Sequence, residues 1–98
     1  MTIQLSGTTF SGPYFHTRQF DPDFACVYVI LNPLNQVVDI GQTNSINNRI
    51  ISHDRKDCWY THGCNDQGLY VHISNDENYR IMLERVLREV YMPLCGER

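Results

Sequence analysis

The sequence predicts a small α+β domain in which a three-stranded mixed or antiparallel sheet is flanked by helices. Its 98 residues have room for one domain with a modest core. Two neighbouring apolar segments rich in β-branched residues, over 24–31 and 36–41, indicate paired strands. Apolar residues at helical spacing over 46–51 and 79–90 indicate helices before and after a third strand, over 68–74.

The first two strands form a predicted hairpin. Phe24–Leu31 is a continuous apolar run, and the Asn32-Pro33 pair that follows it is typical of a turn. Gln36–Gly41 then has the composition of a second strand. Two strands that are joined by about four turn residues pair in the antiparallel sense.

The predicted helices have start and stop signals. Residues 43–45 offer capping oxygens before a helix that we expect to begin at Ile46 and to end near residue 55 or 56. A polar loop with a short helical turn is expected over 57–67. Asn75 is the expected cap of the last helix, and Pro93 ends it. The apolar stripe of that helix consists of Tyr79, Met82, Leu83, Val86, Leu87 and Val90.

The N-terminal residues have no convincing period. Thr, Ser, Gly and Pro alternate irregularly with aromatic residues there, and a short edge strand would fit within 8–20. We therefore expect an N-terminal extension over 1–23 that lays aromatic side chains against the core of a domain over 24–98.

Charge and hydropathy limit the classes of partner. The net charge of −3 argues against strong autonomous binding of nucleic acid, because phosphate contacts need lysine and arginine. Affinity for a nucleic acid would come from a local basic cluster, a second subunit, a fused partner or a metal ion. The sequence has neither a stretch that fits a membrane span nor the features of a signal peptide, so we expect an intracellular, cytoplasmic protein without a membrane partner.

The four cysteines, at positions 26, 58, 64 and 95, are expected to be free thiols in a reducing compartment. Zinc is an alternative, because His53, Cys58, His62 and Cys64 lie close together in the sequence. Their spacing matches no common zinc finger or ribbon, in which ligands usually pair as C-x2-4-C.

Three residues near the second strand are candidates for a functional site. Gly41 permits a positive φ or the close approach of a ligand, although a plain strand-to-helix turn explains it as well. Arg49 and His53 are four residues apart and would share one face of the expected helix. Arginine suits phosphate and histidine can relay protons near neutral pH. An exposed polar face is the alternative for this pair.

Two further candidates lie on a strand and on the last helix. Glu84 lies outside the apolar stripe, where it either joins a ladder with Arg80 and Arg88 or reaches round the helix edge to bind Mg²⁺. Tyr28 lies in the middle of the first hairpin strand, where a core tyrosine is the common case. To act as a base it would need its pKa of about 10 lowered by a nearby cation.

The order of these candidates is informative. Along the chain it reads Cys26-Val27-Tyr28, Asp39-Ile40-Gly41-Gln42-Thr43, Asn48-Arg49, His53, Glu84 and Pro93. This order resembles the GIY-YIG nuclease family over residues 24–95. In that family two short triplets lie on adjacent strands of a hairpin, a G-x-T stretch leads into a helix with an Arg and often a His, and a Glu stands on a later helix. The resemblance implies a GIY-YIG-like version of the α+β fold.

The chain departs from the family pattern at several positions. Cys26 and Val27 replace the Gly and Ile of the first triplet, and Asp39 replaces the Tyr of the second, so that DIG stands for YIG. The polar Asn that the family has near its C-terminus has no clear counterpart over 93–96.

The resemblance implies a single catalytic site. Glu84 would hold one Mg²⁺ or Mn²⁺, which acts as a Lewis acid. Tyr28 would orient or deprotonate the attacking water, and Arg49 would neutralise charge on the phosphoryl oxygens. His53 would assist the water or the phosphate.

The resemblance also implies a substrate and further contacts with it. Gly41, Thr43 and Asn48 would help to bind the substrate, and Asp39 would either be a second carboxylate near the metal or repel the phosphate. The expected activity is a metal-dependent endonuclease that hydrolyses phosphodiester bonds in DNA, with a branched, nicked or flap structure as one option. A homo-oligomer or a DNA-binding partner protein would supply affinity. The alternative is a catalytically degenerate module that binds nucleic acid or protein.

Overall fold

The computed structural model describes residues 1–96 and shows an α+β domain. Its strands are β1 Thr2–Leu5, β2 Thr8–Phe15, β3 Cys26–Leu31, β4 Val37–Thr43 and β5 Gln67–Ile73. Its helices are α1 Ile46–Ile50, α2 Lys56–Thr61 and α3 Glu77–Tyr91. The strands form one five-stranded sheet in the order β1-β2-β5-β3-β4, and every neighbouring pair is antiparallel. None of the helices within residues 1–96 has the length and apolar character that crossing a bilayer requires.

The predicted hairpin of β3 and β4 is confirmed. Its register places Tyr28 opposite Gly41. On its other side β3 pairs with β5, the third predicted strand, so that all the residues of β3 are buried. This central position explains why the β3 sequence is continuously apolar rather than alternating.

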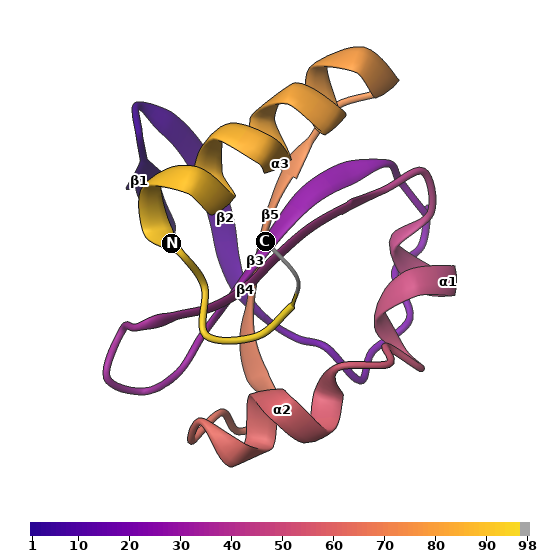
Figure 1. Cartoon of the computed structure of the whole chain (residues 1–98). Coiled ribbons are helices and arrows are strands. Elements are labelled where there is room, and N and C mark those ends of the chain that lie inside the picture. Colours follow the sequence, from indigo (N-terminus) through magenta and orange to yellow (C-terminus); the bar gives the residue numbers. More distant parts are fainter. Residues whose placement is uncertain (97–98) are drawn as a thin grey trace.

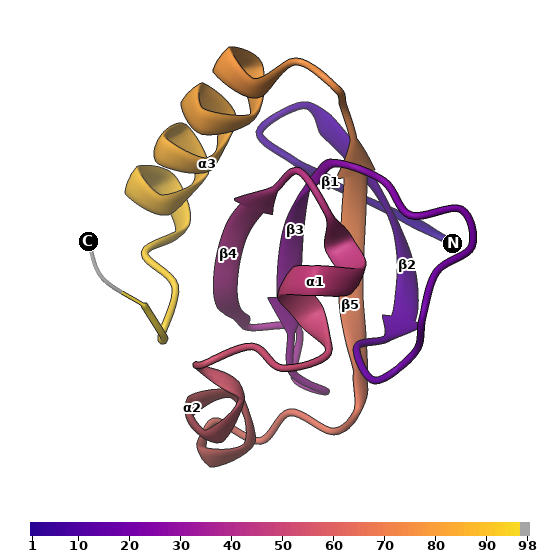
Figure 2. The same cartoon turned by 90° about the vertical axis from the view of Figure 1, so that its right-hand side faces the viewer.

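Residues 1–23, expected to form an extension, contribute the other two strands of the sheet (Figure 2). β1 and β2 form a hairpin through Ser6 and Gly7, whose φ angles are 50° and 80°. β2 then pairs with β5, with register shifts between Ser11 and Tyr14. Such a shift breaks the alternation of inward and outward side chains, which hides the strand in the sequence. The prediction of three strands is therefore wrong, because the sheet also contains the two strands of this N-terminal hairpin.

The first helix is shorter than expected. Ser45 caps α1 by accepting a hydrogen bond from the Asn48 backbone N–H, but the helix ends at Ile50 and not near residue 55 or 56. His53 lies in the segment between α1 and α2, so it does not share a helix face with Arg49. The side chain of His53 is fully buried, and the chain leaves the helix in order to place it in the core.

The pleat of the central strand divides the core into two layers. Val27 and Val29 of β3 pack with Leu83 and Leu87 of α3. The alternate residues of β3, including Tyr28, belong to the cluster that α1 and α2 cover. Figure 1 accordingly shows α3 on one side of the strands and α1 and α2 on the other. β4 is an edge strand, so groups from both layers can meet beside it.

Only one side of the apolar stripe of α3 packs in the core. Leu83 and Leu87 are buried, whereas Met82, Val86 and Val90 are 50%, 40% and 59% exposed. The outer side of the stripe is therefore largely exposed.

The expectation of four free cysteines is wrong for two of them. Cys58 of α2 and Cys95 form a disulfide, whereas Cys26 and Cys64 are buried free thiols. The segment after α3 returns to β4, where the Cys95 backbone N–H donates to Val38 O over 2.7 Å. This return brings together two cysteines that are 37 residues apart, a pairing for which the sequence spacing holds no signal.

The N-terminal hairpin supplies a test of the five-stranded sheet. Phe10 of β2 is fully buried, whereas Phe15 on the same strand is 51% exposed. We expect Phe10→Ala to lower the free energy of unfolding in urea by about 3–5 kcal/mol and Phe15→Ala to lower it by less than about 1 kcal/mol. Equal effects of the two substitutions would contradict the integration of residues 1–23 into the core.

Candidate functional site

The close approach of Tyr28 to Gly41 shapes the site. The two residues are cross-strand partners, and the phenol of Tyr28 lies directly over the Gly41 backbone. A Cβ atom at position 41 would lie closer to Tyr28 Oη than any real contact allows. Glycine is therefore needed here for the space that the phenol occupies, and not for an unusual backbone angle.

A cavity of about 570 Å³ opens beside Tyr28 at the β4 edge of the sheet. Tyr28 of β3, Arg49 of α1 and Glu84 of α3 all line it, so three of the four predicted catalytic residues come together from three elements. The remaining lining residues are Gly41, Gln42, Asp54, Arg55, Arg88 and Gly96.

His53, the fourth predicted catalytic residue, lies behind Tyr28 and is not among the residues that line the cavity. Its Nδ1 accepts a hydrogen bond from the Arg55 backbone N–H over 3.0 Å. In the neutral ring the proton is therefore on Nε2, which donates to Tyr28 Oη over 2.7 Å. Both ring nitrogens are thus occupied within the protein, and His53 reaches the cavity only through Tyr28.

Burial keeps both members of this pair neutral. It lowers the pKa of His53 to about 4, an effect to which the nearby cations Arg49 and Arg55 add. Burial also raises the pKa of the Tyr28 phenol, and the positive charge of Arg49 opposes that shift. At neutral pH the site therefore presents a phenol, held by an imidazole donor, to the cavity.

Asp39, one of the departures from the pattern described above, is fully buried and hydrogen-bonded through both oxygens. Its Oδ2 accepts from Arg55 Nε and from Trp59 Nε1, each over 2.8 Å. Its Oδ1 accepts from Arg88 Nη2 over 2.9 Å and from the backbone N–H of Ile40 over 2.8 Å. Asp39 is not among the lining residues, and it holds two arginines beside the cavity instead.

Arginine side chains gather at the cavity. Three of the eight basic residues of the chain line it, namely Arg49, Arg55 and Arg88. Arg49 also pairs with the exposed carboxylate of Asp54 over 3.0 Å. Arg55 and Arg88 pair with Asp39, so each of the three guanidinium groups at the cavity has a carboxylate partner.

Glu84 offers a carboxylate to the same cavity. Its side chain is 29% exposed, and within residues 1–96 its ion pair is with Arg88, from Nε to Oε2 over 3.8 Å. Burial raises the pKa of the Glu84 carboxyl, and the positive charge of Arg88 opposes that shift. Mg²⁺ is commonly held by one or two carboxylates together with water and substrate phosphates. Among the predicted catalytic residues, Glu84 is therefore the carboxylate that could hold such an ion, and Arg88 is its ion-pair partner in the structure.

Two of the predicted substrate-binding residues lie elsewhere. Thr43 Oγ1 donates to Ser45 O and accepts from the Ser45 backbone N–H, so it stabilises the start of α1. Asn48 is exposed on α1, and neither residue lines the cavity. Gly41 is the third, and it does line the cavity.

Sequence reasoning missed Arg55 and Arg88 as members of the site. The sequence predicts Arg88 only as a member of a ladder with Arg80 and Glu84, whereas Arg80 is buried and donates to Gln42 Oε1. The i, i+4 spacing of Glu84 and Arg88 was the available signal for Arg88. For Arg55 the sequence holds no comparable signal, because its partner Asp39 precedes it by 16 residues.

The four residues of the zinc alternative do not gather as one group. Within the described part of the chain, Cys58 and His62 form a potential metal-ligand group with Cys95 and not with His53 and Cys64. His53 is hydrogen-bonded to Tyr28. Cys64 is a buried thiol, and burial raises its pKa to about 11.

Comparisons with known proteins add no relative: no family model, no curated protein and no solved structure matches the chain. The chemistry of the site is therefore argued from its own geometry.

The anchoring role of Asp39 predicts a large effect on stability. We expect Asp39→Asn to lower the free energy of unfolding by about 3–5 kcal/mol, because two guanidinium groups lose their buried counter-charge. Urea denaturation measures this effect. Asp54→Asn, which removes an exposed partner of Arg49, is the matched control and should leave the unfolding curve nearly unchanged. Similar curves for the two variants would show that Asp39 does not organise the arginines.

The neutral His53 predicts a dependence of stability on pH. Its pKa is about 4 in the folded chain, against an ordinary value of 6.5, so protons bind more readily to the unfolded chain. The contribution is fully present above pH 6.5 and is lost as the pH falls towards 4. His53→Gln should flatten this part of the stability profile in urea denaturation. Burial also lowers the pKa of His16, but His16 is present in both proteins and contributes equally to both profiles. Parallel stability profiles of the variant and the wild type would therefore contradict the role given to His53.

Proposed function

We propose that this chain is a metal-dependent endonuclease that hydrolyses phosphodiester bonds in DNA, with a site like that of the GIY-YIG nucleases. The observation that carries the proposal is the meeting of Tyr28, Arg49 and Glu84 in one cavity. They come from β3, α1 and α3, which are distant in the sequence. A phenol, a guanidinium and a carboxylate are the groups that hydrolysis of a phosphodiester needs for its water, its phosphate and its metal.

Arginines bind the phosphate in this proposal. Arg49 reaches the cavity from α1 and exchanges its exposed partner Asp54 for a phosphate oxygen. Arg55 and Arg88 stay attached to Asp39, which fixes their side chains before the substrate arrives. Guanidinium groups that are held in place stabilise charge that develops on the phosphoryl oxygens, because they need no reorganisation during the reaction.

Glu84 would hold a single Mg²⁺ or Mn²⁺, which supplies Lewis-acid chemistry when bound. Burial raises the pKa of the Glu84 carboxyl because it disfavours the charged carboxylate, and a cation bound there would offset that cost.

Tyr28 orients the attacking water. Its Oη accepts from His53 Nε2, so its own proton is available to a partner in the cavity. Burial raises the pKa of the phenol, so loss of that proton depends on positive charge nearby, which Arg49 supplies. His53 is a positioning residue that acts through Tyr28 and does not itself touch the substrate.

The substrate class is DNA, with a branched, nicked or flapped form as the preferred shape. The chain carries a net charge of −3, so long contacts along a regular duplex are unfavourable, and the basic groups at the cavity suit a short segment. A second copy of the chain or a DNA-binding partner would add the remaining affinity.

A catalytically degenerate binding module is the second candidate. The engagement of Asp39 with Arg55 and Arg88 favours it, because that arrangement retains a phosphate-binding surface whether or not a metal binds. Titration with Mn²⁺ separates the two functions: the nuclease binds the ion in a manner that Glu84→Gln removes, and the degenerate module does not.

The proposed roles predict the activity of site variants. We expect Mg²⁺-dependent cleavage of flap and nicked oligonucleotides, abolished by a chelator and restored by Mn²⁺. Glu84→Gln should abolish it, and Arg49→Ala should slow it by about 10²–10³-fold. Tyr28→Phe should slow it by about 10²–10⁴-fold. Gel assays of single-turnover cleavage measure these changes.

Matched controls come from the same elements. Glu89 and Arg85 are exposed on α3 and do not line the cavity, so Glu89→Gln and Arg85→Ala should retain wild-type rates. Cleavage that persists undiminished in Glu84→Gln would identify a contaminating nuclease and overturn the proposal.

A further inference from the structure

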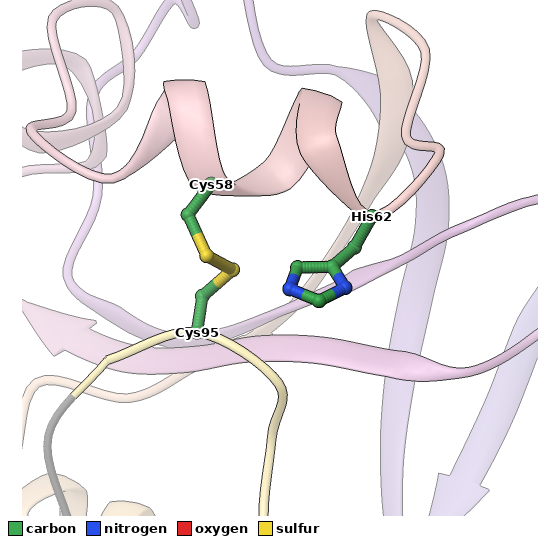
Figure 3. Close-up of side chains that lie close together, drawn as sticks. All are labelled: Cys58, His62 and Cys95. Carbon is green, nitrogen blue, oxygen red and sulfur yellow. A yellow bond between two sulfur atoms is a disulfide. The ribbon is translucent and has the colours of Figure 1, made fainter.

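A second group of potential ligands lies outside the catalytic cavity. Cys58 and His62 stand one turn apart at α2 and its C-terminal cap, and Cys95 approaches them from the segment after α3. Figure 3 shows the His62 ring beside the disulfide of the two cysteines. The ligand atoms of all three residues lie within 4.8 Å of one another.

Two hydrogen bonds hold the two sides of this group in place independently of the sulfur–sulfur bond. Cys95 N–H donates to Val38 O over 2.7 Å, which attaches the C-terminal segment to β4. On the other side Trp59 attaches α2 to the core, since its indole donates to Asp39 Oδ2 over 2.8 Å. Opening of the disulfide would therefore leave two thiols facing each other beside a half-buried imidazole.

The spacing suits a thiophilic metal. In a tetrahedral zinc site, Zn–S bonds of about 2.3 Å and Zn–N bonds of about 2.0–2.1 Å place neighbouring ligand atoms about 3.5–3.8 Å apart. The three ligand atoms already lie within 4.8 Å, so small side-chain movements bring them to these separations. Two thiolates and one imidazole supply three ligands, and the fourth position is left to water or to another ligand.

We propose that Cys58, His62 and Cys95 form a zinc site in the reduced protein, so that the disulfide and bound Zn²⁺ are alternative states of one site. A dithiol reductant supplies two electrons and two protons to open the disulfide, and it is itself oxidised to a disulfide. Zn²⁺ then replaces the two thiol protons, which are released to solvent. Either state joins α2 to the C-terminal segment, whose next residue, Gly96, lines the catalytic cavity.

The test is a zinc titration of the full chain in both redox states, read by competition with a chromophoric chelator. The reduced protein, kept in a phosphine reductant, should bind one Zn²⁺ per chain and the oxidised protein none. Cys58→Ser and Cys95→Ser should abolish tight binding. His62→Ala should weaken zinc binding by about 10–100-fold or more, because loss even of a residue that only orients a metal ligand lowers metal affinity by that factor. Cys64→Ser removes a buried thiol outside the group and should bind as the wild type does.

Substitution by Co²⁺ gives a second readout, because thiolate-to-cobalt charge transfer reports the number of sulfur ligands. Two thiolates should be seen in the reduced wild type, one in each cysteine variant that retains Co²⁺, and two in His62→Ala. Equal zinc binding in the oxidised and reduced wild type, a comparison that needs no variant to fold, would overturn the proposal. Wild-type affinity in both Cys95→Ser and His62→Ala would overturn it as well.

Discussion

The buried carboxylate of Asp39 is the constraint on which the rest of the site depends. It joins β4 to α2 through Trp59 and to α3 through Arg88. A buried charge is costly unless it is paired and fully hydrogen-bonded. The two carboxylate oxygens of Asp39 accept hydrogen bonds of 2.8–2.9 Å from the Ile40 backbone and from the side chains of Arg55, Trp59 and Arg88. The same ion pairs that compensate the charge of Asp39 also hold two arginines at the cavity.

The second constraint is steric, and it acts across the hairpin. The phenol of Tyr28 fills the volume that a side chain at Gly41 would need. Its ring therefore passes over β4 towards the edge of the sheet, where the layers on the two faces can both contribute groups. This explains how Arg49 of one layer and Glu84 of the other share a cavity, although the sheet separates their helices.

Local patterns predicted the elements whose stability is local. The strands β3, β4 and β5 and the helix α3 were found because apolar periodicity and turn residues lie within each segment. The N-terminal hairpin escaped because bulges interrupt its alternation, and the end of α1 because burial of His53 overrides helical spacing. The Cys58–Cys95 pair and the Asp39 contacts depend on the path of the chain through space, which no spacing encodes. Residue chemistry and the order of the motifs indicated Tyr28, Arg49 and Glu84 as candidates, whereas only coordinates could give their common cavity.

The return of the C-terminal segment to β4 has a consequence for association. The Leu94 and Cys95 backbone N–H groups donate to Val37 and Val38 O, so they occupy hydrogen-bonding positions on an outer strand of the sheet. Exposed strand edges readily recruit strands from other chains. A chain truncated before Leu94 would lack these hydrogen bonds and would expose the edge of β4. We therefore expect the truncated chain to self-associate.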